Sequence, residues 1–138
     1  MANEALKAEV VSAEGLVWEG SAISVVARTT EGDLGVMARH EPFLAALVPC
    51  AAEILTPSGD REILAVDGGF ISVSENKVAL IAQYAQVARE IKIDVAEREL
   101  AVAEKALDDG DESSDAIQRR NRALAQVKAA YKVAGKGH

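Results

Sequence analysis

The sequence predicts an α+β chain of two parts, an N-terminal all-β unit followed by an antiparallel hairpin of two helices. Up to about Ala82 the apolar residues come in short, β-branched runs separated by turn residues, which is typical of closely spaced strands. From Ile93 onward they recur at steps of three and four, which is the period of a helix. So many strands in about eighty residues indicate a small antiparallel sandwich or barrel.

Six runs are expected to form strands, at residues 6–12, 17–29, 51–56, 61–66, 70–73 and 77–82. Turn residues separate them: a proline-initiated turn at 57–60 joins a hairpin, and the segments 67–69 and 75–76 supply residues that tolerate positive φ. The run 63–66 is apolar without alternation, which we expect where both faces of a strand are covered.

The first helix is expected to begin at Ile93 and to end at Asp109-Gly110, and Ser113 or Ser114 can cap the second helix. The expected apolar stripes are Ile93, Ala96, Leu100, Ala103 and Leu107 on the first helix and Ile117, Leu124, Val127, Tyr131 and Ala134 on the second. The first stripe is narrow and rich in alanine, so at ~25 cal/mol per Å² its docking energy is modest. The hairpin can therefore detach without unfolding the β unit, unless the alanines form a tightly packed interface.

Length and composition exclude several classes of protein. The 138 residues allow one ordinary domain, or a small domain with an appendage, and a composition with 49% apolar and 27% charged residues favours a folded chain. No apolar run approaches the ~20 residues of a membrane span, and the N-terminus has no apolar signal segment, so we expect a soluble protein that is not exported. The single cysteine, Cys50, suits a reducing compartment and is interpreted as a small apolar core residue.

The net charge of −7 argues against a nucleic-acid-binding protein. Residues 1–90 hold 6 basic and 13 acidic residues, a balance of −7, whereas residues 91–138 hold 9 of each. An acidic cluster at 108–115 is followed only by basic charges, at Arg119, Arg120, Arg122, Lys128, Lys132 and Lys136. This order complements a helix dipole on a solvated face, and it equally describes a surface for an acidic partner; composition favours the first interpretation.

The common motifs of catalysis and metal binding are absent from the sequence. It has no Walker loop, dinucleotide-binding glycine pattern, His-Glu-x-x-His or paired Cys-x-x-Cys, and its only histidines are His40 and His138. A histidine-based catalytic or metal site would depend on His40 alone, so His40 is interpreted as a residue that structures a loop or an interface. We expect no catalytic residue, no metal site and no enzyme.

Residues 31–42 are expected to form one loop. Gly32, Gly35 and Pro42 restrict its backbone around Asp33 and His40, which is typical of a loop that presents polar groups to a partner. An ordinary glycine-bounded β-turn with an incidental histidine explains the same residues equally well.

Residues of this segment also resemble a known family. The matching residues are Glu31, Gly32, Asp33, Leu34, Gly35, His40, Pro42, Phe43, Leu44 and Leu47, and the segments 17–20, 66–73 and 76–82 resemble further motifs in the same order and spacing. Over about residues 6–88 the chain is similar to the epsilon subunit of F-type ATP synthases. It departs from that family at Ala38, where proline is frequent, and at Arg39, where glycine is frequent; the C-terminal half matches in length, layout and basic ending alone.

The resemblance implies a sandwich of about ten antiparallel strands over residues 1–88 and a regulatory helical hairpin over residues 89–138. It implies a non-catalytic rotor subunit in the central stalk of a proton-translocating synthase, at the cytoplasmic face of a bacterial plasma membrane and without insertion into the bilayer. In that family the sandwich binds the gamma subunit and the c-ring. The helices fold onto the sandwich or extend toward the alpha and beta subunits of the catalytic head, where they block ATP hydrolysis.

The resemblance also assigns site residues. It implies a c-ring contact at Glu31, Asp33 and His40, and an inhibitory contact with the catalytic head through Arg119, Arg120, Arg122, Lys128 and Lys132. We expect Asp33 and His40 to lie together at the end of the sandwich that faces the ring.

Some bacterial members of the family bind regulatory ATP through Asp-x-x-Arg at the start of the first helix. Here Asp94 is followed by Glu97 at the arginine position, and Arg98 comes one residue late. One residue is 100° of helix rotation, so Arg98 points away from the face that Asp94 shares with position 97. We therefore expect weak ATP binding or none, and no other cofactor.

Two other functions fit the residues without the resemblance. One is a free-standing β-sandwich binding module that dimerises through its hairpin, and the other is a small hydrolase that uses His40.

Overall fold

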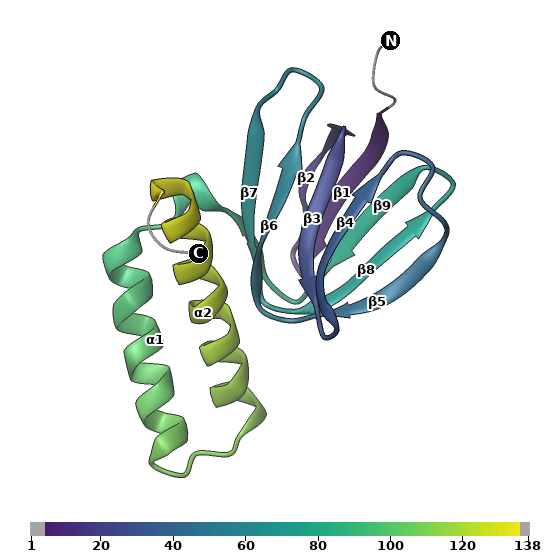
Figure 1. The fold of residues 1–138 in the computed structure, drawn as a ribbon. Helices are drawn as coiled ribbons and strands as arrows, with labels where there is room; N and C mark the ends of the chain where they lie inside the picture. Colours follow the sequence, from purple (N-terminus) through teal and green to yellow (C-terminus); the bar gives the residue numbers. More distant parts are fainter. Residues whose placement is uncertain (1–4, 136–138) are drawn as a thin grey trace.

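The computed structural model describes residues 5–135 and has a ten-stranded β-sandwich followed by two helices (Figure 1). The strands are β1 (Leu6–Ser12), β2 (Gly15–Ala22), β3 (Ser24–Thr29), β4 (Gly32–Met37), β5 (Phe43–Leu47), β6 (Cys50–Leu55), β7 (Arg61–Val66), β8 (Gly69–Ser74), β9 (Lys77–Ile81) and β10 (Ala85–Val87). A 3-10 turn, η1 (Ala88–Glu90), leads to α1 (Ile93–Asp108) and α2 (Ser114–Ala134). The predicted fold class is confirmed.

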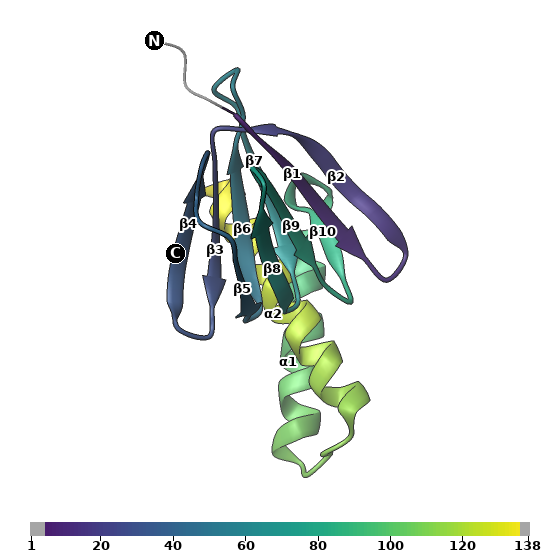
Figure 2. The same cartoon turned by 90° about the vertical axis from the view of Figure 1, so that its right-hand side faces the viewer.

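The strands follow one another in the order β10-β7-β6-β3-β5-β8-β9-β1-β2, and β4 pairs with β3 outside this path. Among the described strands every pair is antiparallel except β1 with β9. The sheet curls until β10 contacts β2, so the sandwich approaches a closed barrel (Figure 2).

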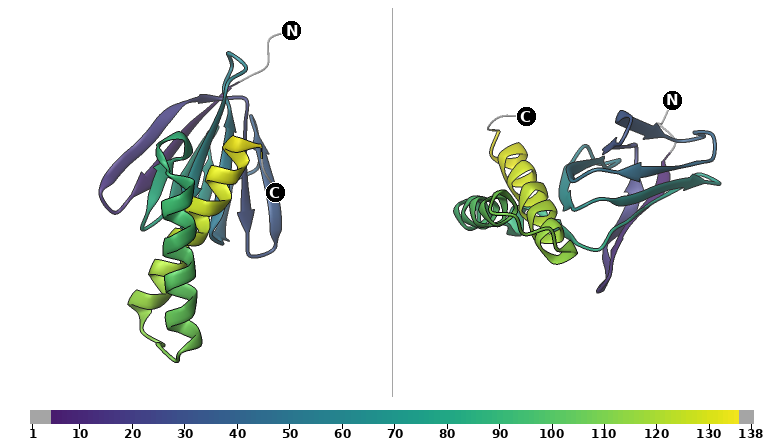
Figure 3. Two further views of the ribbon diagram at one scale, coloured as in Figure 1. Left: turned by 90° about the vertical axis from the view of Figure 1, so that its left-hand side faces the viewer. Right: turned by 90° about the horizontal axis from the view of Figure 1, so that it is seen from below.

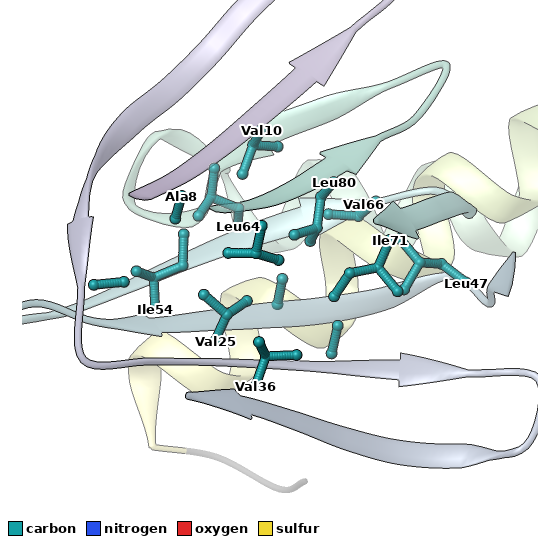
Figure 4. Packing of buried hydrophobic residues seen from close by; sticks show 14 of the residues in the cluster. Ala8, Val10, Val25, Val36, Leu47, Ile54, Leu64, Val66, Ile71 and Leu80 are labelled. Atoms are coloured by element: carbon teal, nitrogen blue, oxygen red, sulfur yellow. The ribbon is translucent and has the colours of Figure 1, made fainter. Parts of the chain in front are cut away.

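The core lies inside this curl, because alternate residues of each strand point inward. Its largest fully buried side chains include Leu6, Ile54, Leu64, Ile71 and Leu80, four of which surround Val25 and Val36 in Figure 4. Burying each such side chain stabilises the fold by about 1.5–3 kcal/mol. The sandwich therefore has a core that does not depend on the helices.

The hairpin packs against the outside of the sandwich through one helix. Helix α2 contacts β6, β7 and η1, and α1 packs on α2 away from the sheet (Figure 3). The Ser113 hydroxyl accepts a hydrogen bond from the Ala116 N–H at 3.1 Å and caps α2, whose C-terminal Gly135 has φ 72°. The predicted helix boundaries and the Ser113 cap are confirmed.

Two predicted boundaries in the β unit are wrong. The run 17–29 is two strands that separate at Ile23, a residue with no sequence signal for a break. Residues 31–42 are not one loop, because β4 occupies Gly32–Met37. Its glycines hide the strand pattern, yet they are compatible with an edge strand that pairs along its length with β3 alone. Strands β5 and β10 were not among the six predicted runs.

The predicted turns are confirmed at the backbone level. Gly68, Gly69, Glu75 and Asn76 all have positive φ. Gly69 has a second constraint, since an added Cβ would collide with the carbonyl oxygen of Ile81 on β9. Glycine is therefore required there both for the turn and for the close approach of β8 and β9.

The predicted stripe of α2 is wrong at its two ends. Ile117 is 43% exposed and Ala134 is exposed, whereas Leu124, Val127 and Tyr131 are half-buried. The fully buried residues of α2 are its alanines, Ala116, Ala123, Ala125, Ala129 and Ala130. Ala125 and Ala129 pack on Ala65 of β7 and on Ala88. Small side chains let the helix lie close to the sheet, which gives the tightly packed alanine interface that was the alternative expectation. The apolar run 63–66 is explained: Leu64 and Val66 face the core, and Ala65 faces α2.

Candidate functional surfaces

The turn between β3 and β4 presents Glu31 and Asp33 at one end of the sandwich. The Thr29 hydroxyl orders this turn by accepting from the Glu31 N–H at 3.1 Å and donating to the Gly32 carbonyl at 2.9 Å. Asp33 lies opposite Arg28 on β3, with Nε and Oδ1 3.8 Å apart and both side chains mostly exposed. This ion pair contributes about 0–1 kcal/mol, so Asp33 is available to a partner at little cost in stability.

His40 lies at the other end of β4. Asp33 and Met37 are four positions apart on β4, a length of about 13 Å, and the two turns are at opposite ends of the sandwich in Figure 2. The expectation that Asp33 and His40 lie together is therefore wrong, and the reason is the strand that was mistaken for a loop. The His40 ring is 5.0 Å from the ring of Phe43 on β5, and its Nδ1 is 2.8 Å from the Glu41 carbonyl oxygen.

Arg39, beside His40, has φ 68°, in the left-handed region that glycine prefers. Its N–H donates to Asn76 Oδ1 at 2.9 Å, and Asn76 Nδ2 donates to the Ala5 carbonyl at 3.1 Å. Arg39 thus adopts a backbone conformation that favours glycine, at a position where the sequence resemblance leads us to expect a glycine.

Strands β5, β8 and β9 lie on the part of the sandwich remote from the helices (Figure 1), and each of them carries an exposed large apolar side chain. Leu44 is 68% exposed, Phe70 is 52% exposed and Ile81 is 49% exposed. Phe70 pairs with Ala46 on one side and Ile81 on the other, so these residues form a row across three strands, and Leu44 lies two residues before Ala46, opposite Ser72. Sequence reasoning missed it, although the alternation of buried Ile71 and Val73 with outward Phe70 was a signal.

The basic residues of α2 divide between three environments. Arg122, Lys128 and Lys132 reach the sandwich, whereas Arg119 is exposed. Arg120 lies beside Glu104, Leu107 and Asp108 near the loop of the hairpin, and its buried Nε has no hydrogen-bond partner within residues 5–135. The five predicted contact residues do not form one surface while the hairpin is docked.

Lys132 binds Glu53 of β6, with Nζ 3.4 Å from Oε1, and Arg61 of β7 pairs with the same carboxylate. Partial burial alone would raise the pKa of Glu53, but the two cations outweigh it and hold that pKa below its ordinary value. Lys128 Nζ donates to the Pro49 carbonyl at 3.4 Å. These contacts anchor the C-terminal turns of α2 on the sheet.

Arg122 stacks on Tyr84, with its guanidinium carbon 4.8 Å from the ring centroid. Gln126 Nε2 donates to the Tyr84 hydroxyl oxygen at 2.8 Å and approaches Gln86 Oε1 at 3.3 Å, and the Tyr84 hydroxyl donates to that same oxygen. Burial raises the pKa of Tyr84, so the phenol stays protonated at neutral pH.

A groove of about 480 Å³ runs between α2 and the sheet and is lined by Arg28, Asp33, Cys50, Arg61, Lys128 and Lys132, among others. Arg28, Arg61 and Lys132 already have carboxylate partners. Cys50 is buried at the base of the core, where burial raises the pKa of its thiol despite the two nearby lysines. We interpret the groove as part of the docking contact.

Asp94 and Arg98 are both exposed on α1. Glu97, which stands at the arginine position of the ATP-binding pattern, instead accepts a hydrogen bond from the Tyr131 hydroxyl of α2. Within residues 5–135 no group of three or more acidic, histidine or cysteine side chains is arranged to bind a metal. Neither described helix has the length and hydropathy of a membrane-spanning helix.

The β-sandwich domain model of the ATP synthase delta/epsilon chain matches residues 5–88. The chain belongs to the ATP synthase delta/epsilon family. It is 42% identical over 144 residues to the ATP synthase epsilon chain of Cutibacterium acnes, with 99% of this chain and 98% of the relative covered. The epsilon chain of Streptomyces avermitilis is 46% identical over 110 residues, which cover 80% of this chain and 86% of that one.

Solved structures share the fold of this epsilon-family chain at lower identity. A chain of the Euglena gracilis mitochondrial ATP synthase matches with a TM-score of 0.72 at 20% identity, over 94% of this chain and 81% of that one. A chain of the Tetrahymena thermophila central stalk and c-ring matches with a TM-score of 0.58 at 13% identity, over 96% and 98%. The predicted family is confirmed. The prediction of a structural subunit is confirmed as well, because the relatives are named ATP synthase epsilon chains. The interpretations as a hydrolase and as a free-standing binding module are therefore set aside.

Proposed function

We propose that this epsilon subunit couples c-ring rotation to the catalytic head through gamma and restrains ATP hydrolysis through its hairpin. The observation that carries the proposal is the division of the sandwich surface. The outer face of β6 and β7 is covered by α2, whereas the face of β5, β8 and β9 is apolar and open. One face thus serves the chain's own regulatory helices and the other is available to a rotor partner.

The gamma subunit is the proposed occupant of the apolar face. Contiguous exposed side chains such as Leu44, Phe70 and Ile81 are typical of a protein interface, and aromatic residues are enriched at the centres of such interfaces. His40 contacts Phe43, whose side chain packs against the core, at the end of the sandwich opposite the β3–β4 turn, so it is placed away from the proposed ring contact.

The c-ring is the proposed partner of the β3–β4 turn. Glu31 and Asp33 are both exposed at that end of the sandwich, Asp33 at the edge of the groove beside α2, and their carboxylates can accept hydrogen bonds from polar loops of the ring. The subunit would reach the membrane in this way, through other subunits at the cytoplasmic face, without entering the bilayer.

The hairpin is the proposed inhibitory element, and the structure described here has it docked. Arg122, Lys128 and Lys132 face the sandwich in this state and can reach the alpha and beta subunits only after α2 leaves the sheet. Arg119 and Arg120 complete the basic surface. Because Glu97 is bonded to Tyr131, we propose that ATP does not control this equilibrium.

The test is reconstitution of the subunit with gamma and the catalytic head. Leu44→Asp together with Phe70→Asp should abolish binding to gamma, whereas the matched change Val102→Asp, of an exposed apolar residue on α1, should leave it intact. Equal binding of both variants would rule out this face as the gamma site.

A further inference from the structure

The docked hairpin is held by side chains that the proposed inhibitory role needs elsewhere. Arg122 contacts Tyr84, Lys128 contacts Pro49, and Lys132 contacts Glu53. The apolar part of the same interface has buried alanines at its centre, which bury little area each, with Ile63, Tyr84 and Ile91 packed around them. The polar contacts add to this apolar packing.

Tyr84 is the residue of the sandwich that both Arg122 and Gln126 of α2 contact. It lies between β9 and β10, and its N–H donates to Asp67 Oδ1 at 3.1 Å, which ties it to the β7–β8 turn. Its ring faces Arg122 and its hydroxyl faces Gln126, which is one helical turn further along α2. Two successive turns of the helix thus converge on one side chain of the sandwich.

Loss of the Lys132 contact costs less docking free energy than loss of the Tyr84 contacts. Glu53 keeps Arg61 as a partner when Lys132 leaves, so no buried charge is stranded. When α2 leaves Tyr84, by contrast, Gln126 and Arg122 lose their partners together. The Tyr84 cluster is therefore the part of the interface whose loss changes docking most.

We propose that Tyr84, Gln86, Gln126 and Arg122 form a latch that sets how much of the hairpin is undocked, by competing with the acidic surface of the catalytic head for Arg122. The proposal rests on the inhibitory role proposed above, and it adds the regulation of that role. Arg122 cannot reach a carboxylate of the head while α2 is docked and holds its guanidinium over Tyr84. Weakening the latch must therefore increase inhibition, whereas removing Arg122 must loosen the hairpin and weaken inhibition.

A thiol-accessibility measurement on the full chain tests the latch. Ala65 is fully buried under α2, so in a Cys50→Ala background an Ala65→Cys thiol reacts with a soluble reagent only while the hairpin is undocked. The labelling rate is then proportional to the undocked fraction. Circular dichroism on each variant keeps global unfolding separate from undocking.

Tyr84→Leu should raise the labelling rate about ten-fold and Arg122→Gln about five-fold, and the double variant should resemble Tyr84→Leu because both changes remove the same contact. Arg119→Gln removes the same charge from an exposed position of α2 and should leave the rate unchanged. Unchanged rates in the Tyr84 and Arg122 variants, or an equal rise in Arg119→Gln, would overturn the latch.

ATP hydrolysis by the assembled enzyme separates the latch from the inhibitory role. Tyr84→Leu should lower hydrolysis, because more of the hairpin is free to reach the head. If labelling rises while hydrolysis stays the same, the latch stands and its competition with the head is wrong. If labelling does not rise, the latch is wrong whatever hydrolysis does.

Discussion

Glu97 of α1 accepts a hydrogen bond from the Tyr131 hydroxyl of α2. Position 97 is the arginine position of the Asp-x-x-Arg pattern that is expected in members of the family that bind ATP. The acceptor raises the pKa of Tyr131, which keeps its proton on the phenol and the bond intact. The N-terminal turns of α1 are thereby joined to the C-terminal turns of α2.

We predict that the purified chain binds ATP weakly or not at all, since a carboxylate at position 97 repels phosphates. Isothermal titration with ATP checks this. Saturable micromolar binding that disappears in Asp94→Ala would contradict it and would show that Asp94 and Arg98 do form a nucleotide site.

Ala129→Leu should weaken docking of the hairpin, because Ala129 is fully buried against β7 and overpacking costs about 1–3 kcal/mol. The labelling rate of the Ala65→Cys thiol should rise, while the sandwich stays folded. Ala101→Leu, on the exposed side of α1, is the matched control and should change nothing. A similar rise in both variants would show that α2 does not pack as described.

Asp33→Arg should weaken coupling between proton movement and ATP hydrolysis without unfolding the sandwich. Its ion pair with Arg28 is exposed, so the free energy of unfolding should change by less than about 1 kcal/mol in urea titration. Glu75→Arg makes the same charge change at the opposite end of the sandwich and should leave coupling intact. Full coupling in Asp33→Arg would remove the proposed ring contact.

Arg39→Gly should be more stable to urea than Arg39→Ala by about 0.5–1 kcal/mol, because glycine adopts φ 68° without steric strain. Both variants lack the arginine side chain, so the difference in their free energies of unfolding reports the cost of the left-handed backbone conformation at position 39. Equal stability of the two variants would mean that the left-handed conformation at position 39 is relaxed or absent.

Much of the fold was predictable because its signals are local. Helix boundaries follow from Ser113 and Gly110, and several strands follow from turn residues. Strand β4 was missed because Gly32 and Gly35 lack the side chains that carry the period, and the edge position of this strand is a property of the sheet as a whole. The buried face of α2 was misassigned because large apolar residues were ranked above alanine.

The Tyr84 cluster could not be predicted, because Arg122 and Gln126 are about forty residues away from Tyr84 in sequence and no periodic pattern relates them. The basic ending of the chain was visible, but the division of its charges between Tyr84, Glu53 and solvent depends on how α2 docks. Only the three-dimensional arrangement shows that the docked state engages Arg122, Lys128 and Lys132, which belong to the proposed inhibitory surface.

ATP hydrolysis by membranes carrying the assembled synthase, with the full chain and with a chain that ends at Ala88, tests the central claim most directly. The truncated subunit keeps the sandwich core and the apolar face, so gamma should still retain it, as immunoblotting of washed membranes would show. We predict that hydrolysis rises on truncation, because the inhibitory helices are gone. Unchanged hydrolysis with the truncated subunit still bound would contradict the regulatory role of the hairpin.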